Sequence, residues 1–143
     1  MPKRTDIKSV LKQGWIDVIQ LPFSLLDPDP FLAKLDLIRR TGVGVIIRSS
    51  LKEGFLTGKY KRDALFPDPN DPRHGWPPEQ IASAVDSAEQ FRFIEAETGS
   101  MAVAAACYPL CFAETSTVIL GTKSVAQADS NFGLVSGSRL SES

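Results

Sequence analysis

The sequence has little of the chemistry that metal centres and disulfide frameworks need. It contains one histidine, His74, and two cysteines, Cys107 and Cys111, among 143 residues. A protein metal site needs more ligands of these types, so we expect none. Two cysteines do not make a disulfide framework, and we interpret both as small apolar core residues, because unpaired cysteine is commonly buried.

Net charge and long apolar runs are also scarce. The formal net charge is −1, so no basic excess exists to drive nucleic-acid binding. The apolar stretches are too short to span a bilayer, and no apolar region follows the basic residues 1–4 as it would in a secretory signal. We therefore expect no nucleic-acid or membrane partner and a cytoplasmic location. Hydrophobic residues at 43% and charged residues at 23% are typical of a globular domain, here residues 1–143.

Apolar patterning predicts an alternation of strands and helices. Short apolar runs predict strands over residues 16–21, 43–47 and 117–120. The second run does not alternate with polar residues, so we expect it to be covered on both faces. Helical spacing predicts helices over residues 5–11, 31–40, 79–97 and 125–132. Ser100 is expected to cap a further helix, with Pro109 inside it at a cost of about 3 kcal/mol.

The predicted order α-β-α-β-α-α-β-α implies parallel strands joined by crossover helices. A sheet of three strands leaves two unpaired edges and uncovered apolar surface. Residues 59–78 form a long polar loop that contains five prolines, and loops of this length inside a domain are often functional lids. The tail after Gly133 is rich in serine and glycine.

Three segments carry a family pattern. They are residues 16–20 (Ile-Asp-Val-Ile-Gln), residues 48–60 (Arg-Ser-Ser-Leu-Lys-Glu-Gly-Phe-Leu-Thr-Gly-Lys-Tyr) and residues 118–131, which begin Val-Ile-Leu-Gly-Thr-Lys-Ser-Val-Ala-Gln. In this order and spacing they resemble the carboxy-terminal half of the aldo-keto reductase superfamily, in the branch with Arg-Ser-x-Leu after the seventh barrel strand. The resemblance extends over nearly the whole chain, residues 7–133. It implies an α/β fold, a partial (β/α)8 TIM barrel with strands six to eight, and NADPH-dependent carbonyl reduction as the family activity.

The resemblance assigns cofactor roles to residues after the first two strands, at the barrel end where such enzymes place their sites. Gln20, at the end of the first strand, would hydrogen-bond the nicotinamide carboxamide, because a side-chain amide both donates and accepts. Arg48, at the end of the second strand, would pack on the nicotinamide ring. Ser49, Leu51 and Gly54 follow in the loop that would hold the pyrophosphate, where glycine lets the backbone approach the ligand closely.

The third segment places a lysine and hydroxyls at the start of a predicted helix, which indicates a phosphate site on physical grounds alone. The residues are Gly121, Thr122, Lys123 and Ser124. The resemblance implies that the phosphate is the adenosine 2′-phosphate, so the expected cofactor is NADP. Gln127 and Asn131 lie at i and i+4 on one helix face, and the family uses these positions around the adenosine end.

No catalytic residue is assigned. The family's chemistry needs a Tyr, a Lys, an Asp and a His from the first half of the barrel, and we expect that half to precede Met1 and to be absent. His74, Tyr60 and Tyr108 match no catalytic position of the family. Asp71 and Arg73 resemble the family's Asp-x-Arg segment and are expected to be structural.

Three hypotheses for the function follow. In the first, the chain is an NADP(H)-binding fragment that binds the cofactor weakly and is inactive alone. In the second, it is half of a working reductase, completed by another chain with the first half-barrel or by a second copy of itself. In the third, it is a non-enzymatic interaction protein, either nucleotide-responsive or vestigial.

Overall fold

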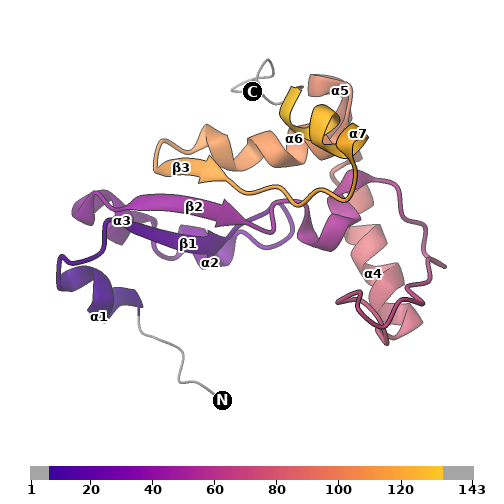
Figure 1. The fold of residues 1–143 in the computed structure, drawn as a ribbon, viewed down its shortest axis with the longest axis horizontal. Coiled ribbons are helices and arrows are strands. Elements are labelled where there is room, and N and C mark those ends of the chain that lie inside the picture. Colours follow the sequence, from indigo (N-terminus) through magenta and orange to yellow (C-terminus); the bar gives the residue numbers. More distant parts are fainter. Residues whose placement is uncertain (1–6, 134–143) are drawn as a thin grey trace.

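Three parallel strands and the helices between them make up the fold (Figure 1). The computed structural model describes residues 7–133, so residues 5–6 of the first predicted helix and the tail after Gly133 lie outside it. The strands β1 (Val18–Pro22), β2 (Gly44–Arg48) and β3 (Thr115–Val118) lie in the order β1-β2-β3, and both pairings are parallel. The predicted α/β class with crossover connections is confirmed.

Most of the predicted helices are present, but several are shorter or divided. The helices and helical turns are α1 (Ile7–Lys12), α2 (Asp29–Leu32), α3 (Leu35–Thr41), η1 (Lys52–Thr57), α4 (Pro78–Glu89), η2 (Arg92–Ile94), α5 (Glu95–Thr98), α6 (Met101–Cys107), η3 (Tyr108–Cys111), α7 (Val125–Ala128) and η4 (Asp129–Gly133). Single helices over residues 31–40 and 79–97 were therefore wrong predictions, whereas the helix over residues 125–132 is present as α7 followed directly by the π-helical turn η4. Lys34, for example, has φ −116° between α2 and α3, and apolar spacing does not record such a local turn.

Pro109 does not lie inside a helix as predicted. The helix α6 ends at Cys107, and Pro109 occupies the first turn of η3. Proline is tolerated in a first turn because the N–H there has no partner within the helix, so the expected cost does not arise. The same turn exposes Cys111, which the sequence placed in the core, whereas Cys107 is buried as predicted.

Ser100 caps α6 as predicted. Its backbone is extended, with φ −154° and ψ 122°, and its Oγ accepts a hydrogen bond from the N–H of Val103 at 3.4 Å. We expect Ser100→Ala to lower the free energy of unfolding by about 1 kcal/mol, measured by urea denaturation. Ser100→Asp is the matched control, because aspartate caps helices as well as serine does. Equal losses in both variants would contradict the capping role.

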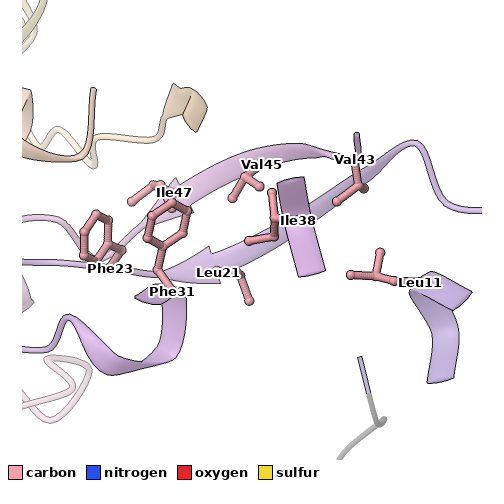
Figure 2. Close-up of a cluster of buried hydrophobic side chains, with 8 residues drawn as sticks. All are labelled: Leu11, Leu21, Phe23, Phe31, Ile38, Val43, Val45 and Ile47. Atoms are coloured by element: carbon pink, nitrogen blue, oxygen red, sulfur yellow. The ribbon is translucent and has the colours of Figure 1, made fainter. Parts of the chain in front are cut away.

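The main core lies on one face of the sheet, against α1, α2 and α3 (Figures 1 and 2). It consists of Leu11, Leu21, Phe23, Phe31, Ile38, Val43, Val45 and Ile47. Val45 and Ile47 are 0% exposed, and they alternate along β2 with half-buried positions. The prediction that this strand is covered on both faces is therefore wrong for the described residues.

The opposite face of the sheet carries exposed side chains. Side chains alternate along a strand, so Gln20, Ile46 and Thr117, which are paired across β1, β2 and β3, share this face. Val18, at the start of β1, and Ile119, the residue after β3, are 50% and 49% exposed. This part of the chain thus presents a mixed apolar and polar sheet surface with two unpaired edges, as the sequence predicted.

A second core fixes the segment that follows β2. Phe55 and Leu56 of η1 are 2% and 0% exposed, and they pack with Ile81 and Val85 of α4 and Met101 of α6. The backbone between β2 and η1 is consequently fixed at both ends, by the sheet before it and by this second core after it.

The predicted long loop is present between η1 and α4, although Pro78 already belongs to α4. Phe66 and Trp76 attach this loop to Phe55, with ring centroids 6.3 Å and 5.9 Å from that of Phe55. The loop therefore packs on the second core. Among residues 7–133, no helix has the length and apolar character needed to cross a membrane.

Candidate functional site

A groove of about 630 Å³ lies between the segments that follow β2 and β3. Its walls come mainly from within residues 49–60, 71–73 and 119–131. Parallel strands end at the same edge of a sheet, so the segments that follow neighbouring strands meet there. The volume lies within the range of about 300–1,000 Å³ that is usual for small-molecule sites.

Eight of the predicted cofactor residues line this groove: Ser49, Leu51, Gly54, Gly121, Thr122, Lys123, Gln127 and Asn131. Arg48 instead lines an adjoining cavity of about 180 Å³, which shares three residues with the groove. The shared residues are Ser49, Lys52 and Glu53. Arg48 also donates a hydrogen bond from Nη1 to Ser49 Oγ at 3.1 Å. Ser49 lines both cavities, so Arg48 lies at their boundary.

Gln20 and Ser124 line neither cavity. The prediction that Gln20 ends its strand is wrong, because β1 continues to Pro22 and Gln20 lies in the middle of it. Its side chain is exposed and belongs to the uncovered face of the sheet. Ser124 Oγ accepts a hydrogen bond from the N–H of Gln127 at 3.2 Å as the N-cap of α7, so its oxygen serves the helix start.

The wall after β2 has an uncommon backbone. Ser49, Lys52 and Glu53 have φ of 59°, 44° and 50°, and Gly54 has φ of 88°. Left-handed backbone is disfavoured for residues with a Cβ, and surrounding contacts must hold it in place. The φ of Gly54 favours glycine, and a Cβ there would also lie 3.3 Å from the ring of Tyr60, a tight contact.

Asp71 and Arg73 form a buried ion pair beside the groove. Arg73 Nε and Nη2 donate to the two carboxylate oxygens of Asp71 at 2.8 Å and 2.6 Å. The two side chains are 10% and 8% exposed. These hydrogen bonds hold the pKa of the Asp71 carboxyl well below its usual range and raise the pKa of the Arg73 guanidinium. Both residues also line the groove.

The depressed pKa of Asp71 makes part of the stability depend on pH. The unfolded Asp71 has an ordinary pKa of about 3.9, and the folded value lies below it. The pair therefore contributes its full stabilisation of the folded state above the unfolded pKa, and this stabilisation is lost as pH falls toward the folded pKa. We expect the difference in unfolding free energy between wild type and Asp71→Asn to shrink from about pH 5 to about pH 2, measured by urea denaturation. A difference that stays constant would contradict this role.

The opposite wall starts at Lys123, whose backbone N–H donates to Gln127 Oε1 at 2.7 Å. The Lys123 side chain is 82% exposed, and its Nζ lies 3.9 Å from Asp71 Oδ2. An exposed pair at that distance contributes little stability, so the ammonium group remains available to a ligand.

Charges along the groove favour an anion. The charged lining residues are Lys52, Lys59, Arg73, Lys123, Glu53 and Asp71. Four of these side chains are cationic and two are anionic. Lys52 is also paired with Asp27 outside the groove, with Nζ 3.0 Å from Oδ2, which offsets one of the four positive charges. The lining still keeps a small excess of positive charge.

Several lining residues were not assigned a role from the sequence. Lys59 and Tyr60 belong to the second family segment, and that membership was the available signal. Arg73 was expected to be structural, and it also reaches the groove wall, through a hydrogen bond to the carbonyl of Glu53, 20 residues earlier in the chain. No spacing pattern in the sequence records such a contact.

Solved structures with similar folds are aldo-keto reductases. The chain aligns with the glycerol dehydrogenase AKR11B4 from Gluconobacter oxydans with a TM-score of 0.66 and 27% identity, over 87% of this chain and 38% of that one. It aligns with the holo form of the aldo-keto reductase AKR11C1 from Bacillus halodurans with a TM-score of 0.68 and 22% identity, over 94% and 42%. The predicted fold, part of a (β/α)8 barrel, is confirmed.

Sequence comparisons agree with the fold. The chain is 31% identical over 119 residues to the aldo-keto reductase str7 of Strobilurus tenacellus, which is 80% of this chain and 35% of str7. It is 30% identical over 86 residues to the NADH-specific methylglyoxal reductase of Escherichia coli, 60% and 26% of the two chains. The chain thus spans about a third of the length of these curated relatives. The sequence profile of the Aldo/keto reductase family matches residues 5–143, and the chain belongs to that family.

Proposed function

We propose that this chain forms the NADP(H)-binding side of an aldo-keto reductase barrel, with its three strands as barrel strands six to eight. The observation that carries the proposal is the single groove in which two separate predicted segments meet. Ser49, Leu51 and Gly54 lie on one wall, and Lys123 and Asn131 lie on the other. A dinucleotide needs two such walls, one for its pyrophosphate and one for its adenosine end.

The residues present fit a nicotinamide dinucleotide. The groove has space for a small-molecule ligand and an excess of cationic side chains. Its wall also holds Ser50, which is 1% exposed and whose Oγ has no hydrogen-bond partner among the described residues. Buried hydroxyls are usually satisfied, so this unpaired oxygen is consistent with a polar ligand bound along this wall.

Each wall would have a separate task in cofactor binding. The Ser49–Gly54 segment would hold the pyrophosphate, and Lys123 with Thr122 would bind the adenosine 2′-phosphate by charge-assisted hydrogen bonds. Arg48, in the adjoining cavity, would pack on the nicotinamide ring. NADPH, when bound, supplies the hydride for reduction of a carbonyl group. Among the 143 residues, none is assigned as the proton donor of that reaction.

Titration of NADPH into the purified chain tests the proposal. We expect a saturable change in nicotinamide fluorescence with weak affinity, because the described walls enclose the ligand only partly. NADH, which lacks the 2′-phosphate, should bind more weakly still. No saturable change with either dinucleotide would contradict cofactor binding, and tight one-to-one binding would contradict the expected weakness.

A second candidate function is one half of a split reductase, with another chain supplying the remaining barrel strands. The observation that favours it is the uncovered sheet face, where Val18 and Ile119 are half exposed, together with Trp15 at 80% exposed beside β1. Exposed apolar side chains and unpaired strand edges favour association.

Light scattering and an activity assay distinguish the two functions. A split reductase predicts that addition of a chain with the first five barrel strands gives a one-to-one complex with carbonyl reductase activity. Self-association without that partner would instead indicate that a second copy covers the face. A monomer that stays inactive in the presence of the partner would exclude the split enzyme.

A further inference from the structure

Arg73 connects the long loop to the groove wall after β2. Its Nη1 donates a hydrogen bond to the carbonyl oxygen of Glu53 at 2.7 Å. Glu53 and Gly54, the two residues at that point, have left-handed backbone with φ of 50° and 88°. The hydrogen bond therefore ends on the part of the wall whose conformation most needs external support.

The guanidinium is itself fixed on several sides. Asp71 accepts two hydrogen bonds from Nε and Nη2. The Cζ of Arg73 lies 3.9 Å from the ring centroid of Phe66 and 4.9 Å from that of Tyr60. A planar guanidinium can stack and donate in its plane at the same time, so these contacts leave Nη1 directed at Glu53.

Arg73 therefore has a geometric task at this site. Its charge is compensated by Asp71 through a bidentate pair, which makes it a weak source of attraction for an incoming anion. A Cβ added at Gly54 would lie 3.7 Å from Arg73 Nη1, in van der Waals contact with it. A shift of the guanidinium would therefore change the backbone conformation of the Glu53–Gly54 turn that lines the groove.

We propose that Arg73 is a positioning residue for the pyrophosphate half of the cofactor: it holds the Glu53–Gly54 turn in the left-handed conformation that shapes the groove wall. The inference rests on the proposed cofactor site and adds a residue that acts on the ligand through the turn. It assigns the long loop a definite role, since Asp71, Arg73 and Phe66 all come from it.

Arg73→Lys tests the structural half of this inference without any ligand. Lysine keeps the charge but cannot form the bidentate pair and the third hydrogen bond together. The Gly54 N–H donates to Leu51 O at 2.9 Å in the turn. We expect its hydrogen exchange to become about tenfold faster in the variant, while the N–H of Val45 in the sheet exchanges at the wild-type rate.

Ligand affinities test the cofactor half. We expect Arg73→Lys to lower the affinities for NADPH and NADH by the same factor, about tenfold, because both ligands carry the pyrophosphate. The affinity for adenosine 2′-phosphate should stay unchanged, because this ligand has no pyrophosphate to meet the turn. A general loss of packing would lower the affinities for all three ligands, and that outcome would overturn the assigned role.

Arg62→Lys is the matched control. Arg62 lies in the same loop and pairs with Asp86 at 2.8 Å and 2.7 Å, but it does not line the groove. It should change neither the exchange of Gly54 nor any affinity. If Arg73→Lys does not fold, Arg73→Gln is measured in the same way, since its amide can still donate to Glu53.

The two proposals fail in distinguishable ways. Unchanged exchange of the Gly54 N–H in Arg73→Lys would overturn the positioning role, whether or not a cofactor binds. A wild-type chain that binds neither NADPH nor NADH would remove the proposed function and, with it, the cofactor half of this inference. Wild-type binding with unchanged dinucleotide affinity in Arg73→Lys would overturn the inference and leave the proposed function intact.

Discussion

Phe31→Ala is expected to lower the free energy of unfolding by about 3–5 kcal/mol. Phe31 is 0% exposed, stacks on Phe23 with centroids 4.5 Å apart, and meets the edge of Phe112 at 5.4 Å. The helix α2 has four residues and is too short to be stable without packing, so Phe31 is its main attachment to the sheet. Because small domains have a total stability of about 5–15 kcal/mol, this loss would remove a large part of the free energy of unfolding.

Urea denaturation followed by circular dichroism measures this loss. Phe93→Ala removes the same number of atoms from a side chain that is 72% exposed, so we expect a change within about 0.5 kcal/mol. The loss of unfolding free energy in Phe31→Leu should lie between those of Phe31→Ala and Phe93→Ala, because leucine fills part of the cavity. Similar losses in Phe31→Ala and Phe93→Ala would show that the sheet-side cluster does not carry the stability.

The architecture could be predicted because its signals are local. Short apolar runs mark β1 and β2, and Ser100 marks the start of α6 by cap chemistry that involves only the next three residues. Boundaries were less accurate, as the extension of β1 to Pro22 beyond Gln20 shows. That a three-strand sheet would leave apolar surface uncovered was predicted, but which face of β2 is covered could not be, because a continuous apolar run is compatible with either.

The candidate site divides in the same way. Residues next to strand ends, such as Ser49 and Lys123, were assigned from motif resemblance and lie in one groove. Arg73 was expected to be structural, but its contact with the groove wall could not be predicted, because Glu53 lies 20 residues before it in the chain. Ser124 illustrates a further limit: a hydroxyl at a helix start suits a phosphate ligand and an N-cap equally well, and here its oxygen accepts from Gln127.

Lys123→Ala is expected to lower the affinity for NADPH by about tenfold or more, which is the usual value of a charge-assisted hydrogen bond to phosphate. The affinity for NADH should stay close to the wild-type value, because NADH has no 2′-phosphate. Fluorescence titration of both dinucleotides measures the two effects. Lys61→Ala is the control, since Lys61 is an exposed lysine of the long loop that does not line the groove.

The ratio of the two affinities decides whether this chain prefers NADP. One relative is named for NADH specificity, and Asp71 lies 3.9 Å from Lys123 Nζ, so a competing carboxylate is present at the proposed phosphate position. If Lys123→Ala lowers the affinity for NADPH alone, the ammonium group binds the 2′-phosphate in spite of that carboxylate. If it weakens neither dinucleotide, Lys123 is paired with Asp71 in the bound state too, and the preference for NADP is lost while the pyrophosphate wall still accounts for binding.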